Sequence, residues 1–472
     1  MDTMQKLMEH ISKCFYKPDL QAARIILGTA FAHYIKDQPP IWMFVVGPPS
    51  SGKTAITIEA LSGLTAMFGP GQPWGKGSGD SPSGTEDMDS LMAGVARNKS
   101  RNTNPRWKSD ESVEIMSTIN PNSFLSHQIG KDGEGHSPGL LEQLSGGKYT
   151  MEKQGTRKHV KGNALVLIPD FTVMASMNRD RRGEIMGQLR RIYDGQFEKK
   201  VGTKITKIWN GKLSLLAATT PVIDKYTSID SALGERFIQL NWRASADISR
   251  GTFTLKMMRM RAEGYDIKKP MKDLVKQLFG EHDPTLMQVD DDHPVNDRLS
   301  ALAELVAESR TSVYGHVIDD KFHVENTACP EDIHRIVQQF YIQMSGLCTL
   351  QSRLQPIEQD IQDVLRCGIE TLPTYRSVVL QAAIECKGLR EYAGKDTEKR
   401  WEATKLAALG VIEPVKGETV ILRKRWAAVV KRVGFANHIV FERDGAAGSR
   451  ERTERQTQAD TAAGLDSETE VF

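Results

Sequence analysis

Features of secreted, membrane and metal-binding proteins are scarce in this sequence of 472 residues. Its five cysteines form no Cys-x-x-Cys pair and no cysteine–histidine cluster with the spacing of a zinc site. The N-terminus lacks a basic stretch followed by an apolar one, which argues against a secretory signal. The most apolar run, residues 41–46, is too short to span a bilayer. We therefore expect a soluble, cytoplasmic protein with reduced thiols and no membrane partner.

A strong overall charge is also lacking. The chain has 62 lysines and arginines against 60 aspartates and glutamates, a formal net charge of +2, so any basic surface for nucleic acid must be local. Hydrophobic residues make up 39% of the chain, which is enough to bury a sizeable core. At about 150 residues per domain, the length allows two or three domains.

Apolar runs and helical periodicity alternate along the chain. Residues 1–38 have the periodicity of helices, with a helix start signal at residues 18–19. Residues 41–46 are continuously apolar and contain β-branched side chains, as expected of a strand buried on both faces of a parallel sheet. Residues 164–168 and 212–218 have the same character. Strands separated by helical stretches predict an α/β fold with a parallel sheet.

A glycine-bracketed loop follows the first apolar run and precedes a predicted helix at residues 55–64. Glycines allow backbone N–H groups to close around a phosphate, a lysine reaches the β- and γ-phosphates, and a hydroxyl holds Mg²⁺. This loop has all three, so we predict that it binds ATP and Mg²⁺. The predicted ATP-binding residues are Gly47, Pro48, Pro49, Ser50, Ser51, Gly52, Lys53 and Thr54.

Polar residues end the other two predicted strands. Asp170 follows the strand at 164–168 and is the candidate partner of Thr54 in holding Mg²⁺. An ordinary turn aspartate is the alternative. Thr219 and Thr220 follow the third strand, where a hydroxyl can orient an attacking water. We expect these residues to meet at the edge where parallel strands end.

The order of phosphate-binding loop, acid-tipped strand, polar strand tip and Gly-Glu-Arg-Phe at residues 234–237 resembles the AAA+ ATPase superfamily. The resemblance implies that Arg236 reaches the γ-phosphate held by a neighbouring subunit, and hence a ring, with a hexamer as the first expectation. A structural salt bridge is the alternative for Arg236. Arg335 opens an amphipathic helix similar to the AAA+ lid helix whose arginine senses nucleotide in cis; a solvent-facing arginine is its alternative.

An alternating segment at residues 197–209 predicts a β-hairpin directly before the third strand. Such a hairpin is similar to the AAA+ branch of minichromosome-maintenance helicases and magnesium-chelatase-type ATPases, and to helicase-like ATPases of phages and mobile elements. Lys199, Lys200 and Lys204 are candidate DNA contacts on this hairpin, although a charged hairpin is usually a solvated one.

One position departs from the AAA+ pattern. The strand ending in Asp170 should continue with a glutamate that serves as general base, but Phe171 follows instead. Glu184 on the next predicted helix is an alternative source of a carboxylate. The sequence therefore supports ATP binding better than rapid hydrolysis.

Residues 374–435 resemble a winged helix-turn-helix. Helices are expected at 377–385, at 389–393 and from 396 to a C-cap at Gly410, and strands at 413–415 and 419–422. In DNA-binding members the third helix enters the major groove and the wing touches phosphates. The residues that this resemblance assigns to DNA are Lys399, Arg400, Lys405 and Arg423. Winged helices that dock proteins are the alternative.

These patterns divide the chain into an N-terminal helical segment at 1–40, an AAA+ α/β core at 41–244 with a flexible insertion at about 69–110, a helical lid at 245–356, a winged-helix domain at 357–441 and a disordered tail at 442–472. The predicted function is ATP-driven work on DNA, as a helicase, translocase or initiator. Two alternatives remain. One is a slowly hydrolysing nucleotide switch, in a transcription regulator or defence sensor. The other is a protein remodeller whose winged helix docks protein.

Overall fold

A computed structural model describes residues 2–49, 51–65, 111–117, 119, 123–125, 139–144, 150–151, 157–201, 205–224, 236–243, 249–392, 394–413 and 419–435. The predicted insertion at 69–110 and the predicted tail at 442–472 lie outside these ranges, as do Ser50 and Lys204. In the described ranges, the helices are all too short or too polar to cross a membrane.

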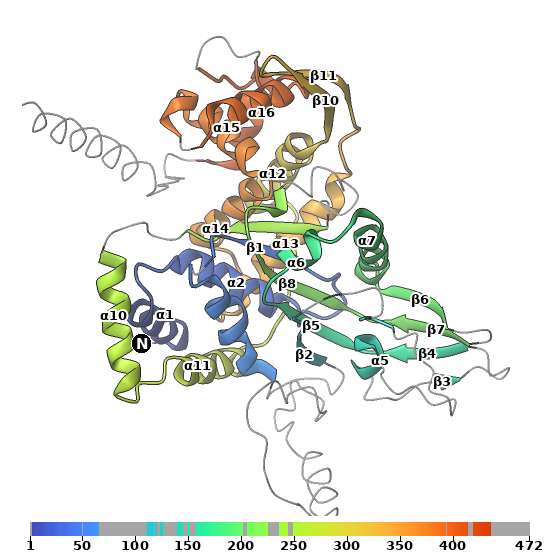
Figure 1. The fold of residues 1–472 in the computed structure, drawn as a ribbon, viewed down its shortest axis with the longest axis vertical. Coiled ribbons are helices and arrows are strands. Elements are labelled where there is room, and N and C mark those ends of the chain that lie inside the picture. Colours follow the sequence, from blue (N-terminus) through green and yellow to red (C-terminus); the bar gives the residue numbers. More distant parts are fainter. Residues whose placement is uncertain are drawn as a thin grey trace, which may run out of the picture.

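A five-stranded parallel sheet forms the centre of the molecule (Figure 1). In chain order its strands are β1 (Trp42–Val46), β2 (Glu111–Ile115), β5 (Asn163–Ile168), β8 (Leu213–Thr219) and β9 (Phe237–Asn241). Across the sheet the order is β2-β5-β8-β1-β9. The strands predicted at 41–46, 164–168 and 212–218 are β1, β5 and β8, so the predicted α/β fold with a parallel sheet is confirmed. β2 and β9 were not predicted.

Helices cover both faces of this sheet. Successive side chains of a strand point to opposite faces, and in β1 all of them are apolar and buried. Met43 and Val45 point to one face, and Trp42, Phe44 and Val46 point to the other. The first face packs with α1 (Thr3–Cys14), α2 (Leu20–Ala32), the short helices η1 (Ala55–Ala60) and η2 (Leu61–Leu64), α11 (Lys268–Glu281), α12 (Pro294–Arg310), α13 (Ile333–Thr349) and α14 (Glu358–Glu370). The second face packs with α5 (Leu140–Leu144), α6 (Thr172–Ala175) and α7 (Arg179–Tyr193).

Helix α14 covers the open edge of the sheet at β9. The side chain of Thr371, which follows α14, accepts the backbone N–H of Gln239 at 3.1 Å, and the carboxylate of Glu370 accepts that of Asn241 at 2.6 Å. An edge strand exposes unpaired N–H groups that favour aggregation. Here side chains of a helix satisfy two of these groups, and they fix α14 against the strand beside β1.

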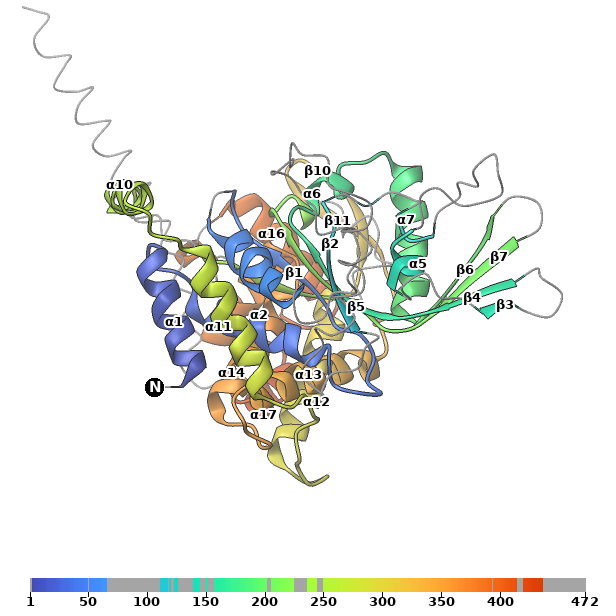
Figure 2. The same ribbon diagram turned by 90° about the horizontal axis from the view of Figure 1, so that it is seen from below.

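A second sheet projects from the central one (Figure 2). It contains β3 (Thr150–Met151), β4 (Arg157–Lys161), β6 (Gln196–Val201) and β7 (Ile205–Asn210), in the order β3-β4-β7-β6. β6 and β7 are antiparallel, which confirms the hairpin predicted at 197–209. The projection arises because β4 leads directly into β5, and β7 into β8, so both strands extend beyond the helical layers.

The segment predicted to be a helical lid contains α10 (Ser249–Ala262), α11, α12 and α13, but also an antiparallel hairpin of β10 (Val313–Ile318) and β11 (Lys321–Thr327). Its strands are rich in β-branched and aromatic residues. Asp319 and Asp320 between them have φ of 46° and 58°, the left-handed backbone of a tight hairpin turn. Helices α11, α12 and α13 share one hydrophobic core with α2 and β1. The division at 245–356 stays a prediction.

The C-terminal helices are α15 (Thr374–Glu385), η5 (Leu389–Glu391), α16 (Asp396–Ala408) and α17 (Lys424–Val433). Gly410 follows α16 with φ of 73°, as its predicted role in ending that helix requires. Where two strands were predicted, the described residues form isolated bridges, Gly388 with Thr419 and Ile412 with Leu422. Residues 414–418 lie outside the description.

Candidate functional site

The predicted phosphate-binding loop lies at the carboxyl end of β1. The N–H of Gly47 donates to the carbonyl of Thr219 at 3.1 Å, which joins the loop to the end of β8. A Cβ on Gly47 would lie 3.0 Å from that of Trp242, so a larger residue would push against Trp242. Gly52 has φ of 90°, a left-handed conformation, and lies against the ring of Phe15. The close approach to Trp242 and the left-handed backbone thus explain why glycine suits these two positions.

Trp242 supports the loop from the side of β9. Its backbone N–H donates to the carbonyl of Val46 at 2.7 Å, and its indole N–H donates to the carbonyl of Ser51 at 3.0 Å. The sequence does not reveal this role, since it depends on β9 lying beside β1. The one sequence feature that hints at this support is a tryptophan directly after a largely apolar segment.

Lys53 is 7% exposed, and its ammonium donates to the carbonyl of Pro48 at 3.2 Å. Burial lowers the pKa of Lys53, and the negative charge of Asp170 partly opposes this shift. Asp170 follows β5, two strands away from β1. The structure thus brings the predicted lysine and the predicted acid within electrostatic range of each other.

A set of hydroxyl groups lies beside Asp170. The Asp170 carboxylate accepts the backbone N–H of Thr172 at 2.9 Å. The Thr172 hydroxyl is 3.4 Å from that of Thr219 and 3.3 Å from that of Thr220. β8 lies between β1 and β5, so these hydroxyls stand between the loop and the acid. Thr172 was not predicted as a site residue, because its role depends on the turn after β5.

Thr54 and Asp170 fit the predicted magnesium site in their chemistry. Mg²⁺ prefers oxygen ligands and is usually held by one or two protein oxygens together with phosphates and water. Asp170 is exposed and Thr54 is partly exposed, so both have room for such partners. In the described ranges no cluster of three or more histidine, cysteine, aspartate or glutamate side chains could hold a metal by itself. A metal here would need the nucleotide.

Phe171 cannot replace the missing base. It is 1% exposed, and its ring packs 4.7 Å from Phe44 and 6.0 Å from Phe237. The residue after Asp170 therefore points into the core. Glu184, the predicted alternative, accepts a hydrogen bond from Gln188 and lies near Lys199 of β6. These contacts do not place its carboxylate in the hydroxyl network beside Asp170.

Arg236 lies at the amino ends of the sheet strands (the amino edge), whereas the loop lies at their carboxyl ends (the carboxyl edge). It precedes β9, and its guanidinium is 3.4 Å from the carboxylate of Asp194 and 5.5 Å from the ring centre of Tyr193. Tyr193 packs on Trp42, the first residue of β1. The loop follows the last residue of β1, about 13 Å further along the strand. Arg236 is thus remote from its own loop.

The structure corrects the predicted role of Arg335. Its guanidinium lies over the same Tyr193 ring, 6.0 Å from the centre, so it is at the amino edge with Arg236. An arginine that senses nucleotide in cis must reach the carboxyl edge. Helix α13 begins at Ile333 beside the amino edge and therefore presents Arg335 at the wrong end of the sheet.

The lysines predicted to contact DNA from the hairpin differ in environment. The ammonium of Lys199 donates to the carbonyl of Leu125 at 3.3 Å, and burial lowers its pKa. Lys199 is thus engaged by the protein itself. Lys200 points the other way and is exposed. Lys204 lies outside the described residues.

The predicted groove helix, α16, is partly covered. Lys399 is 1% exposed and donates to the carbonyls of Leu389 and Tyr392, each at 2.7 Å, so its prediction as a DNA contact is wrong. Lys405 is 2.5 Å from Glu402, and its ammonium lies over a ring of β11. It therefore also contacts protein.

Two of the predicted DNA contacts in this region remain on the surface. Arg400 and Arg423 are exposed. Arg423 follows the bridge between Ile412 and Leu422, and its guanidinium donates to the carbonyl of Ile412 at 3.3 Å. These two arginines are on the outside of the C-terminal helices, where a large partner can reach them.

A cavity of about 770 Å³ separates α16 from the turn that follows β8. Asp224 of this turn lines the cavity, and its carboxylate accepts the N–H of Thr374, the first residue of α15, at 3.1 Å. The C-terminal helices are thus attached to the turn next to Thr219 and Thr220. This attachment is a direct structural connection between them and the candidate site.

Comparisons with known proteins do not name a family for this chain. No protein-family model matches it, and a search of the curated proteins finds no match. The geometry at the carboxyl edge of the sheet is therefore the main guide to function. That geometry combines a glycine-bracketed loop, a buried lysine, an exposed carboxylate and three hydroxyl groups.

Proposed function

We propose that this protein is an ATP-binding P-loop ATPase of the AAA+ type. The observation that carries the proposal is that Lys53 and Asp170 lie at the same ends of the parallel strands, within electrostatic range of each other, with hydroxyl groups near the end of the intervening strand between them. A phosphate with its bound metal ion needs a lysine on one side and an acid on the other, and here the lysine comes from the loop after β1 and the acid from the end of β5. The loop, its glycines and the strand before it fit that ligand.

Each residue has a distinct role in this proposal. Lys53, now bonded to its own loop, turns to the β- and γ-phosphates and neutralises their charge. Thr54 and Asp170 hold Mg²⁺, which when bound offsets charge on the terminal phosphates. Thr219 or Thr220 orients a water molecule. Because Phe171 is in the core, no carboxylate from that position accelerates the attack, and we expect hydrolysis to be slow.

The position of Arg236 supports a site that is shared between subunits. It lies at the amino edge of its own sheet and cannot reach its own loop. A neighbouring subunit packed edge to edge in a ring would bring Arg236 to its γ-phosphate, as the resemblance to AAA+ proteins implies. To do so the guanidinium must leave Asp194, whose carboxylate is largely exposed.

Mixing two inactive variants tests this shared site. Lys53→Ala removes the loop lysine but keeps Arg236, and Arg236→Ala has the reverse defect. If the site is shared, mixed assemblies regain part of the ATPase rate, because a Lys53→Ala subunit supplies Arg236 to an intact loop. Asp194→Ala is the matched control, since it breaks the ion pair and keeps the guanidinium. Full activity of Arg236→Ala alone would rule out the shared site.

Work on DNA is the second part of the proposal, and the exposed cations favour it. Lys200, Arg400 and Arg423 are accessible, whereas Lys399 is not. Strong stimulation of the ATPase by single-stranded or duplex DNA indicates a motor, and its loss in Arg400→Ala/Arg423→Ala locates the surface. Little turnover with ATP-dependent assembly indicates the nucleotide switch, which Phe171 favours. No retention of DNA at low salt, where phosphate contacts are strongest, would contradict both DNA roles.

A further inference from the structure

The cavity of about 770 Å³ lies where the central sheet, the β10–β11 hairpin and the C-terminal helices meet. Its walls come from the turn after β8, the end of α12 with the start of β10, the segment between β11 and α13, and helices α15 and α16. The described residues of the phosphate-binding loop, 47–49 and 51–54, do not line it. Small-molecule sites are usually clefts of about 300–1,000 Å³ between such units. The cavity therefore has the size and position of a second ligand site.

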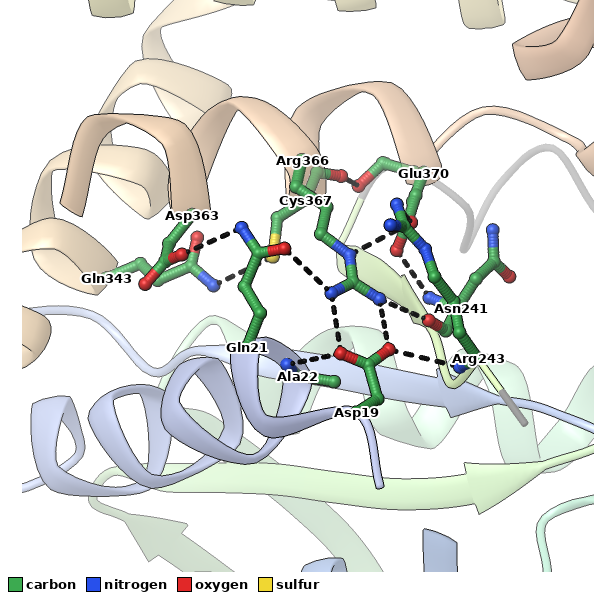
Figure 3. Close-up of polar contacts among 11 residues, drawn as sticks. Asp19, Gln21, Ala22, Asn241, Arg243, Gln343, Asp363, Arg366, Cys367 and Glu370 are labelled. Carbon is green, nitrogen blue, oxygen red and sulfur yellow. Dashed lines mark hydrogen bonds and ion pairs between the residues drawn. The ribbon is translucent and has the colours of Figure 1, made fainter. Parts of the chain in front are cut away.

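One wall of the cavity is anchored by a buried ionic network (Figure 3). Thr371 and Pro373, which follow α14, line the cavity. On α14 itself, Arg366 donates to the carboxylate of Asp19 at 2.9 and 2.6 Å and to that of Glu370 at 3.1 Å. The side chains of these three residues are at most 6% exposed. Because the network joins α14 to the start of α2, this wall is formed before any ligand binds.

Arg310, the last residue of α12, brings an unused hydrogen-bond donor to the cavity. It lines the cavity, and its side chain is 9% exposed. Its guanidinium forms an ion pair with Glu331, which also lines the cavity. The Nε–H of Arg310 is buried and has no hydrogen-bond acceptor in the part of the chain that the structure describes. An unpaired buried donor is costly, so an acceptor on a ligand would stabilise this arrangement.

The charged side chains that line the cavity balance one another. They are four arginines and lysines and four aspartates and glutamates, so the lining has no net charge. Arg376 donates to the carboxylate of Glu402 at 2.7 Å, and Lys405 donates to it at 2.5 Å. Lys395 lies 3.5 Å from Glu398. A ligand with a large net charge would lose its hydration without gaining a counter-charge, so the lining favours an uncharged one.

Three aromatic side chains complete the walls, Tyr314 on β10, Tyr375 on α15 and Trp401 on α16. The indole N–H of Trp401 donates to the carbonyl of Asp320 at 3.0 Å, which fixes the ring. A Cβ on Gly394 would lie 2.7 Å from the ring of Tyr375, so glycine leaves this ring its room. Tyr314 is 49% exposed and therefore accessible to a ligand. Aromatic faces of this kind stack on planar rings.

We propose that this cavity binds an uncharged, planar heteroaromatic molecule such as a nucleoside. Its ring lies against the aromatic side chains, and a ring nitrogen or carbonyl oxygen accepts the Nε–H of Arg310. A heteroaromatic ring suits both features, because it combines a face for stacking with acceptors in its plane. The inference does not depend on the proposed nucleotide site, whose ligand is highly charged and bound by a different part of the fold.

Isothermal titration of the full chain with adenosine, guanosine, cytidine and uridine tests the proposal. We expect at least one of them to bind, and no binding of all four would overturn the proposal. Arg310→Lys keeps a cation beside Glu331 but removes the Nε–H, so it should weaken binding about 10-fold or more. Tyr314→Ala changes an exposed side chain, so it tests the site even if Arg310→Lys fails to fold, and it should weaken binding about 5- to 150-fold. Tyr265→Ala, an exposed tyrosine that does not line the cavity, is the matched control. Unchanged affinity in Tyr314→Ala would also overturn the proposal.

Alkylation of cysteines locates the bound nucleoside. Cys329 is exposed and lines the cavity, whereas Cys386 is exposed and does not line it. The nucleoside should slow the reaction of Cys329 with iodoacetamide, measured by peptide mass, and leave that of Cys386 unchanged. Equal rates at Cys329 with and without the nucleoside would place the binding elsewhere and overturn the proposal.

Two comparisons separate this site from the proposed nucleotide site. The 5′-monophosphate of the same nucleoside adds negative charge and should protect Cys329 less well; equal or better protection would contradict an uncharged ligand. Lys53→Ala should bind the nucleoside as the unaltered chain does, so a failure of the proposed nucleotide site leaves this test intact. Loss of nucleoside binding in Lys53→Ala would instead assign the nucleoside to the phosphate-binding loop and overturn the proposal.

Discussion

The indole N–H of Trp242 offers a single hydrogen bond to the loop that can be removed while an aromatic side chain is kept. In Trp242→Phe the apolar body of the side chain still backs onto Gly47, but the 3.0 Å hydrogen bond to the carbonyl of Ser51 is lost. The net value of such a bond is about 0.5–1.5 kcal/mol. If the bond holds the loop in its binding form, the affinity for ATP should fall about 2- to 12-fold.

Trp401 provides the matched control for this experiment. Its indole N–H also donates to a backbone carbonyl at 3.0 Å, that of Asp320 in the turn between β10 and β11. Trp401→Phe should therefore lose a similar bond and leave ATP binding unchanged. Isothermal titration of both variants measures the two effects side by side. Equal affinities of Trp242→Phe and the unaltered protein, with equal thermal stability, would refute the reasoning about the loop.

Three further predictions concern the core, the sheet edge and the loop. Phe171→Glu should destabilise the fold by about 3–5 kcal/mol in chemical denaturation and not accelerate hydrolysis, because it buries an unpaired charge. Burial raises the pKa of Glu114 on β2 to about 7, so the folded state holds this proton more tightly than the unfolded state does. The free energy of unfolding therefore falls as the pH rises from about 4.5 to 7. Glu114→Gln should raise the free energy of unfolding by about 2–3 kcal/mol at pH 8 and leave it unchanged at pH 4. Gly52→Ala should weaken nucleotide binding, measured by titration, since its φ of 90° costs an alanine about 1–2 kcal/mol. An unchanged affinity in Gly52→Ala, or pH-independent effects of Glu114→Gln, would contradict these two expectations.

The parts of the fold that the sequence predicted are those with strong local signals. β1, β5 and β8 are short, largely apolar runs that end close to a glycine, a proline or a polar residue, and the loop has glycine at its two ends. Asp19 begins α2 as predicted, because its side chain accepts the N–H of Ala22 at 2.9 Å. Such signals depend on neighbours in the chain, so they can be seen without the fold.

The parts that were missed or wrong depend on contacts between distant segments. Trp242 supports the loop only because β9 lies beside β1. Lys399 has the spacing of an exposed lysine, but two carbonyls and the carboxylate of Asp396, 2.9 Å away, satisfy its charge in the interior. Arg335 begins an amphipathic helix as predicted, yet the direction of α13 places it at the amino edge. No local pattern distinguishes these outcomes.

The sequence contains a local signal for the β10–β11 hairpin. Two short runs of β-branched and aromatic residues flank Asp319 and Asp320, and aspartate tolerates the left-handed backbone of a tight turn. The surrounding helical periodicity instead predicts a mostly helical segment. The hairpin contacts α16 through Trp401 and Lys405.

Equilibrium binding of ATP with Mg²⁺ to the full chain, compared with Lys53→Ala, tests the central claim most directly. The loop lysine should contribute a charge-assisted contact to the phosphates, so we predict an affinity lower by about two orders of magnitude in Lys53→Ala. Lys36→Ala, which alters an exposed lysine before β1, should bind as the unaltered protein does. No binding of ATP by the unaltered chain, or equal binding by Lys53→Ala, would contradict the assignment of the site.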